Sequence, residues 1–238
     1  MLIGILETGR PSGALADHGS YPQLFERLLA AEARDFTFRT YAAVDGEVPD
    51  DPHACEAWLV TGSRHGAYER LAWMLKLEEL MRRAVAAHVP VIGICFGHQI
   101  LAQALGGKVV QSDKGWGFGL MDYQVKDGPT DNLTLSALHQ DQVIEVPDGG
   151  RVLGGSDFCP NAIIAYGDTA LSFQGHPEFD ISWMRVAAEH RMKGLAPDAV
   201  VAAAEASFDA KRSDSPIVAK WIVQFLRDKA NAATQAAE

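Results

Sequence analysis

Residues 89–97 constrain the fold more than any other part of the chain. Residues 89–94 (VPVIGI) are nearly all apolar, which is typical of a strand buried on both faces of a parallel sheet. The pattern Gly93-x-Cys95-x-Gly97 follows, and its small residues allow a sharp turn from this strand into a helix predicted at residues 96–105. A strand that ends in such a turn presents one side chain, here Cys95, at the edge of the sheet where open α/β folds bind ligands.

The rest of the first half alternates short apolar strands with amphipathic helices. This alternation is typical of the α/β class, with a doubly wound, mostly parallel central sheet flanked by helices. Strands are predicted at residues 2–6, 36–42 and 57–60, and helices at residues 22–34 and 68–88.

The second half has a different pattern. Residues 108–173 contain short alternating strands separated by Gly, Asp and Pro, which predicts a small antiparallel sheet. Residues 181–230 have helical spacing and predict a helical C-terminal extension. We find no internal repeat and no long linker, so the sequence predicts a single domain over residues 1–238.

Charge and composition exclude several classes of function. The chain has 31 acidic and 21 basic residues, a net charge of -10, and no basic block that could follow a phosphate backbone, so we expect no nucleic acid partner. The apolar runs are shorter than the roughly 20 residues that a bilayer crossing needs, and the start lacks the features of a signal peptide. We therefore expect a cytoplasmic protein without a membrane partner.

The three cysteines, Cys55, Cys95 and Cys159, are odd in number and widely spaced. This spacing fits neither a disulfide framework nor a paired zinc site, so we expect reduced thiols and no metal. Cys95 differs from the others because it begins a predicted helix, whose partial positive charge favours the nucleophilic thiolate. The backbone N–H of Phe96 is free to donate to an oxyanion. The alternative is that Cys95 is a small buried hydrophobic residue.

A cysteine nucleophile needs an imidazole to accept and return its proton, and a carboxylate to orient that imidazole. His176-Pro177-Glu178 supplies both groups at the end of a predicted strand. In an extended i, i+2 pair the two side chains point to the same side, so Glu178 can reach His176. The alternative is a surface turn with incidental charges.

Taken together, GICFGHQ at residues 93–99 and HPE at residues 176–178 resemble the class I glutamine amidotransferases, the type with a Cys, His and Glu triad. The match extends through residues 99–107 and 61–63 and covers most of the chain up to about residue 179. The resemblance implies a fold with flavodoxin-like layers and no cofactor.

The resemblance also implies roles for individual residues. Cys95 would be the nucleophile, His176 the base and acid, and Glu178 the residue that orients it. The N–H groups of Gly62 and Phe96 would form the oxyanion hole. Two further residues would bind substrate, Gln99 and His139, although His139 is equally well explained as a structural residue.

The implied reaction is hydrolysis of the γ-glutamyl amide of glutamine through a cysteine thioester, which releases glutamate and ammonia. In that case a separate synthetase subunit would receive the ammonia, because the sequence contains no P-loop or other synthetase motif. Residues 181–230 instead resemble the endings of stand-alone members, so the chain is similar both to the glutaminase domains of GMP synthases and to γ-glutamyl peptidases that act on glutathione-like compounds.

Three functional hypotheses follow. The first two are a glutaminase and an autonomous hydrolase of γ-glutamyl peptides or amines, both with small-molecule substrates. The third is a non-catalytic binding or regulatory protein, against which the intact triad argues. The helical extension leaves room for a homodimer contact.

Overall fold

A nine-stranded mixed sheet forms the centre of the computed structural model, which describes residues 1–236 and the side chains of residues 1–229. The strand order is β2-β1-β3-β4-β11-β10-β9-β6-β7. The first five strands are parallel to one another, and the others extend the sheet with antiparallel pairs. The parallel strands are β1 (Leu2–Leu6), β2 (Thr37–Tyr41), β3 (Ala57–Val60), β4 (Val91–Ile94) and β11 (Ala170–Phe173).

The second half of the chain supplies the antiparallel strands, as predicted. A separate two-stranded antiparallel sheet lies beside the main one. The exception is β11, which lies within the region predicted as antiparallel but pairs in parallel with β4. The antiparallel strands are β5 (Lys108–Gln111) and β8 (Asp141–Glu145) in the small sheet, and β6 (Gly117–Val125), β7 (Asn132–His139), β9 (Gly150–Gly155) and β10 (Ile163–Tyr166) in the main sheet.

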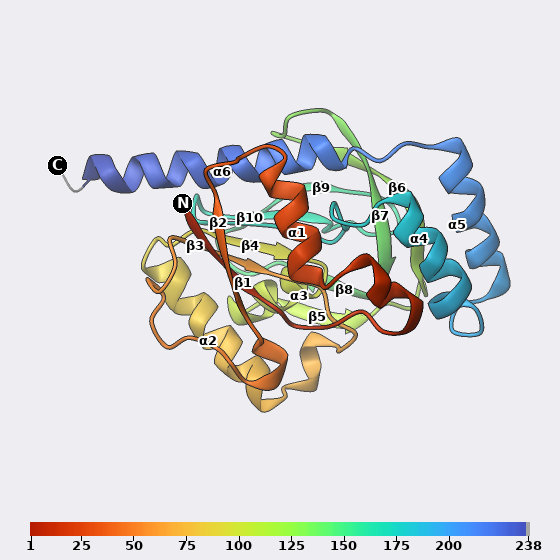
Figure 1. The fold of residues 1–238 in the computed structure, drawn as a ribbon, viewed down its shortest axis with the longest axis horizontal. Helices are drawn as coiled ribbons and strands as arrows, with labels where there is room; N and C mark the ends of the chain where they lie inside the picture. The colour runs from red at the N-terminus through yellow and green to blue at the C-terminus, as the bar shows by residue number, and fades with distance from the viewer. Residues whose placement is uncertain (237–238) are drawn as a thin grey trace.

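Helices cover both faces of the parallel strands, which confirms the predicted fold class (Figure 1). α1 (Tyr21–Ala30) and α6 (Ser215–Ala236) pack on one face, where Phe25 and Ile222 belong to the same buried cluster as Ile5 of β1. On the other face lie α2 (Ala72–Ala86) and α3 (Phe96–Ala104).

The C-terminal extension forms a third packed group at one end of the molecule. α4 (Ile181–Ala187) runs into a π-helical turn (Ala188–Met192), and α5 (Asp198–Ala210) packs against β6. The short 3₁₀ helix η1 (Gly13–His18) contacts both α4 and the π-helical turn. Figure 1 shows α4 and α5 together at the end of the sheet opposite the tip of α6.

Several predicted boundaries were wrong for local reasons. α1 begins at Tyr21 because Ser20 and Gln23 form a capping box, and it ends four residues before the predicted end. The helix predicted at residues 68–88 begins only at Ala72, because η3 (Ala67–Glu69) is a 3₁₀ turn and Arg70 adopts a left-handed conformation with φ 53°.

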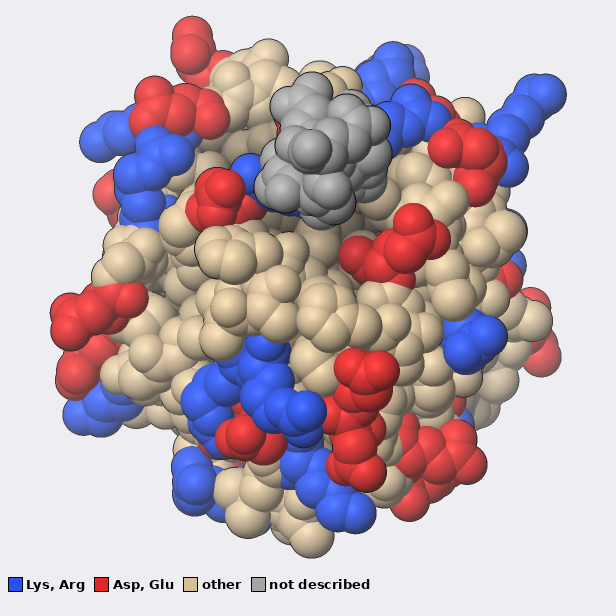
Figure 2. Space-filling model, turned by 90° about the vertical axis from the view of Figure 1, so that its left-hand side faces the viewer, with Lys and Arg blue, Asp and Glu red and all other residues tan. Residues whose placement is uncertain are grey.

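The surface carries mixed charge on the face shown in Figure 2, where basic and acidic side chains lie side by side without one continuous basic patch. None of the helices in the described part of the chain combines the length and apolar character that a bilayer crossing requires.

The turn at Cys95 depends on close contact between α3 and β3, which we expect a methyl group to disrupt. A Cβ at Gly97 would collide with the backbone carbonyl of Val60, whereas one at Gly66 would meet only the ring of Tyr68, which is 43% exposed and can move. Gly97→Ala should therefore lower the free energy of unfolding by about 1–3 kcal/mol in urea titrations. The control Gly66→Ala should change it much less, and equal effects would contradict the proposed crowding.

Candidate active site

The turn between β4 and α3 holds Cys95 in a strained backbone conformation. Its φ and ψ are 54° and -103°, a combination that costs a non-glycine residue of order 1–3 kcal/mol and that persists only where neighbours enforce it. The Cys95 N–H donates to the carbonyl of Phe173 in β11 (2.8 Å), and the Cys95 carbonyl accepts from the N–H of Gln99 (3.0 Å). The thiol is thereby fixed at the carboxyl edge of the sheet.

His176 and Glu178 follow the end of β11, the strand next to β4. The Nδ1 atom of His176 lies 2.7 Å from Oε1 of Glu178, and both side chains are almost completely buried. Burial by itself would lower the pKa of His176, but the carboxylate of Glu178 and the thiol of Cys95 together raise that pKa above its ordinary value. The arrangement favours an imidazolium at His176.

A stack of rings fixes the imidazole of His176. The ring of Phe179 stacks on it with a centroid distance of 4.2 Å, and Trp183 of α4 stacks on the other side of Phe179 at 3.6 Å. The backbone is held too, because the His176 N–H donates to the carbonyl of Ser136 in β7 (2.8 Å), whose hydroxyl donates to the carbonyl of Phe179 (2.8 Å). The second carboxylate oxygen of Glu178 is buried and has no partner among the described residues.

Gly62 and Phe96 both lie next to Cys95. A Cβ at Gly62 would lie 3.0 Å from Cε1 of His176 and 3.8 Å from Cβ of Cys95, so only glycine fits this position without displacing the imidazole. Phe96 is the first residue of α3, and its N–H therefore has no acceptor within the helix.

The peptide between Thr61 and Gly62 is held from its carbonyl side. The Thr61 carbonyl accepts from the hydroxyl of Thr8 (2.9 Å) and from the N–H of Gly97 (3.2 Å). Because N–H and C=O point in opposite directions across a trans peptide, the Gly62 N–H points away from these donors. Buried hydrogen bonds thus fix the orientation of this N–H.

A cavity of about 580 Å³ opens in front of Cys95, and Gln99 and His139 both line it. The amide nitrogen of Gln99 donates to the carbonyl of Asp141 (2.9 Å) and to Oε1 of Gln174 (3.1 Å), which leaves its oxygen for a ligand. Burial lowers the pKa of His139 to about 4, so this residue is neutral near pH 7. The structure therefore brings all seven sequence-predicted site residues to one region.

The other cysteines have different surroundings. Cys55 and Cys159 are buried, and burial raises the pKa of both thiols, that of Cys159 to about 12. His98 is fully buried beside Ser172, at 2.8 Å from its hydroxyl, and burial lowers its pKa to about 3. None of these three residues lines the cavity at Cys95.

Sequence reasoning missed several residues of this region. Thr8 follows the end of a predicted parallel strand, and that position was the available signal. Phe179 directly follows the HPE motif, but its stacking on His176 has no sequence signature. Tyr21 of α1 and Arg191 of the π-helical turn also line the cavity, and they arrive from elements that the pattern could not align with Cys95.

Comparisons with known proteins identify relatives of this chain. The family model described as "Glutamine amidotransferase class-I" matches residues 66–187. Gamma-glutamyl peptidase 2 of Arabidopsis thaliana is 32% identical over 174 residues, which cover 68% of this chain and 69% of that protein. One subunit of the glutamine-hydrolysing GMP synthase of Halobacterium salinarum is 29% identical over 174 residues, which cover 68% of this chain and 85% of that protein.

Solved structures share the fold. The crystal structure of a glutamine amidotransferase from Thermotoga maritima superposes with a TM-score of 0.71 over 95% of this chain and 98% of that one, at 18% sequence identity. The family match spans half of the chain and includes Cys95, His176 and Glu178. This chain belongs to the class I glutamine amidotransferase family.

Proposed function

We propose that this protein is a cysteine amidohydrolase that cleaves γ-glutamyl amides, with Cys95 as nucleophile, His176 as general base and acid, and Glu178 as the residue that orients His176. The observation that carries the proposal is the convergence of the strained Cys95 turn and the 2.7 Å His176–Glu178 pair on one cavity. Nucleophilic catalysis requires this order of groups, with a base next to the nucleophile and a third group that orients the base.

In the first step, the Cys95 thiolate attacks the carbonyl carbon of the γ-amide. Negative charge develops on the carbonyl oxygen, and the N–H groups of Gly62 and Phe96 stabilise it because they are oriented in advance. The His176 imidazolium then donates its proton to the nitrogen, the C–N bond breaks, and the amine leaves. A γ-glutamyl thioester remains on Cys95.

In the second step, neutral His176 accepts a proton from water, which attacks the thioester. Glutamate leaves, and the thiolate and imidazolium are restored. Glu178 stabilises the imidazolium in both steps through its buried carboxylate. Every proton that leaves water or returns to an amine passes through His176.

Two leaving groups compete in this scheme. A cavity of about 580 Å³ is of the size that holds drug-sized ligands, so glutamine would fill only part of it, and this favours a leaving group larger than ammonia. The similarity to a γ-glutamyl peptidase supports the same choice. The second candidate is glutamine hydrolysis coupled to a synthetase subunit, which the similarity to the GMP synthase of Halobacterium salinarum favours.

The substrate preference separates these candidates. We expect the purified chain to release glutamate from γ-glutamyl dipeptides with a higher kcat/KM than from glutamine, and Cys95→Ala to abolish both activities while circular dichroism stays unchanged. Turnover of glutamine alone would favour the coupled glutaminase. Glutamate release by a folded Cys95→Ala protein would refute the mechanism.

Selective labelling tests the nucleophile directly. A diazo-ketone derived from glutamine should modify Cys95 and leave Cys55 and Cys159 untouched, because burial raises the pKa of the latter two thiols. Peptide mass spectrometry reads out the site. Modification of either buried cysteine before Cys95 would contradict the assignment.

The pH dependence tests the role of Glu178. Its carboxylate raises the pKa of His176, so Glu178→Gln should lower that pKa and the imidazolium should be lost at lower pH. We expect the alkaline limb of kcat/KM to move to lower pH and kcat to fall by roughly 10²- to 10⁴-fold. Glu178→Asp keeps the charge and should retain the position of the limb. An unmoved limb in Glu178→Gln would show that Glu178 does not control His176.

A further inference from the structure

Arg191 is an unused cation next to the proposed reacting groups. It lines the cavity in front of Cys95, and it also lines a narrow crevice together with Gly62, Cys95 and His176. Gln99 and His139 line the cavity but not this crevice. Arg191 therefore lies on the His176 side of the thiol.

Arg191 is unpaired in the part of the chain whose side chains the structure describes. The ion pairs of its own segment join Arg185 to Asp209 and His190 to Glu189, and none of those in the side chains described for residues 1–229 includes Arg191. The side chain is partly buried rather than free in solvent. Two acids, Glu69 and Asp141, line the same cavity, but they contact His65 and Tyr68 rather than Arg191.

The surroundings of Arg191 hold its side chain close to the reacting groups. Its guanidinium lies near the hydroxyl of Tyr21: burial raises the pKa of this hydroxyl, and the charge and hydrogen bonding of Arg191 oppose the rise. Tyr21 is 6% exposed and its ring lies 5.8 Å from that of Phe179, which stacks on His176. Arg191 thus lies next to Tyr21 and also lines the cavity.

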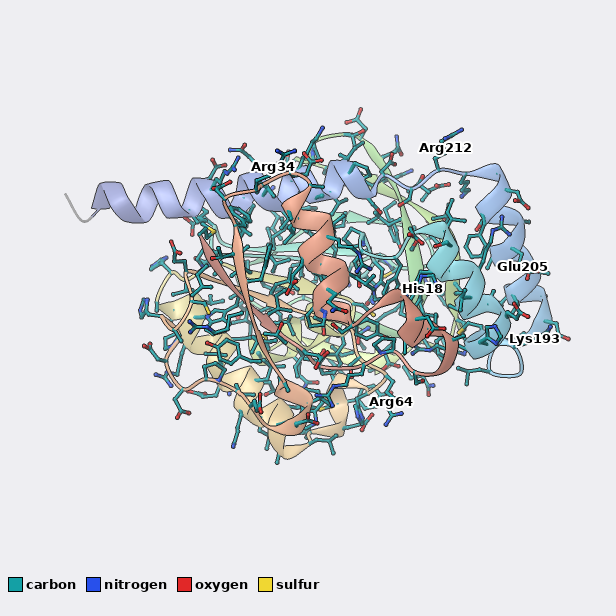
Figure 3. All side chains as sticks on the ribbon, in the orientation of Figure 1. His18, Arg34, Arg64, Lys193, Glu205 and Arg212 are labelled. Atoms are coloured by element: carbon teal, nitrogen blue, oxygen red, sulfur yellow. The ribbon has the colours of Figure 1, made fainter. Side chains whose placement is uncertain are left out.

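The backbone that carries Arg191 is unusual. Residues 188–192 form a π-helical turn, a rare geometry that is often found at functional sites and that changes the direction of side chains relative to a continuing α-helix. Lys193 follows it at the outer end of the segment, away from the sheet (Figure 3). Arg64, on the loop after β3, lines the cavity too, but it is exposed and projects outward from the ribbon in the same view.

The two ends of the cavity differ in charge. Near Gln99 lies Asp141, whose carboxylate accepts from the Tyr68 hydroxyl at 3.3 Å. Arg64, His65 and Glu69 line the cavity on the same segment as Tyr68, and His65 pairs with Glu69, so Asp141 is the carboxylate here that suits the ammonium group of a γ-glutamyl moiety. At the other end Glu178 balances the charge of His176, and Arg191 supplies a further cation. Because His176 protonates the departing nitrogen, whatever is attached to that nitrogen extends toward Arg191.

From this polarity we propose that Arg191 binds a carboxylate on the leaving group, so that the substrate is a γ-glutamyl amino acid or peptide rather than glutamine or a γ-glutamyl amine. This proposal rests on the proposed function. An arginine fork can donate two parallel hydrogen bonds to a carboxylate, which gives both affinity and orientation. Arg191 is then a specificity-determining residue, and Tyr21 positions it.

Matched substrates that differ in one charge test this role. We would compare γ-glutamylglycine with γ-glutamylglycinamide, and γ-glutamylalanylglycine with its C-terminal amide. Arg191→Gln should lower kcat/KM for at least one free acid by about 10- to 100-fold and leave its amide within about twofold. Arg191→Lys should restore part of the loss. The control Arg185→Gln, in the same segment but paired with Asp209, should change neither member of a pair.

Equal losses of kcat/KM for acid and amide would overturn the proposal, since Arg191 would then act on the γ-glutamyl group that both substrates share. No loss of kcat/KM for either acid would also overturn it, since Arg191 would then contact neither substrate.

Binding gives a readout that needs no turnover. The Cys95→Ala protein should bind the preferred acid in calorimetry, and adding Arg191→Gln should weaken Kd by about the same factor. If the unaltered protein cleaves neither member of either pair, the proposed function fails, while this difference in Kd still decides the role of Arg191. The proposed role of Arg191 is overturned if adding Arg191→Gln leaves Kd unchanged, or if the Cys95→Ala protein does not bind the acid.

Discussion

The pairing of β4 with β3 on one side and β11 on the other is the constraint on which the site depends. These three parallel strands end at the same edge of the sheet, so the residues that follow them converge. Gly62 follows β3, Cys95 follows β4 and His176 follows β11, although more than one hundred residues separate the first from the last. A shift in any of these registers would separate the thiol from the imidazole and from the N–H of Gly62.

The buried histidines show which electrostatic effect dominates at each position. His98, His139 and His176 are all buried, and burial alone disfavours the charged form of each. In His98 and His139 burial prevails, and the pKa falls. In His176 burial is opposed by the Glu178 carboxylate at 2.7 Å and by Cys95, and these two together raise the pKa. Glu178 and Cys95 together thus separate a histidine suited to proton transfer from two that stay neutral.

The C-terminal extension takes part in the site as well as in packing. Trp183 of α4 stacks on Phe179 and so supports the ring of His176, while the π-helical turn carries Arg191 to the cavity. The family model ends at residue 187, between these two contributions. The proposed triad of Cys95, His176 and Glu178 therefore lies within the matched residues 66–187, whereas Gly62 precedes them and Arg191 follows them.

The sequence alone determined the features that depend on local pattern. Apolar runs and their spacing predicted four of the five parallel strands and the covering helices, and the small residues around Cys95 predicted the turn that exposes it. The HPE motif predicted the contact between His176 and Glu178, because side chains two residues apart on an extended chain point to the same side. Helix ends were less predictable, since Arg70 adopts a left-handed conformation that its residue type does not favour.

Only the tertiary structure decided which distant side chains complete the region. Thr8, Tyr21 and Arg191 come from a strand end, a helix start and a π-helical turn, and each has an ordinary local sequence. Their positions follow from how whole elements pack on the sheet, which is set by the sum of many apolar contacts rather than by any local periodicity. The sequence thus determined the γ-glutamyl amide chemistry that we propose, and packing determined the charge of the cavity that would select its leaving group.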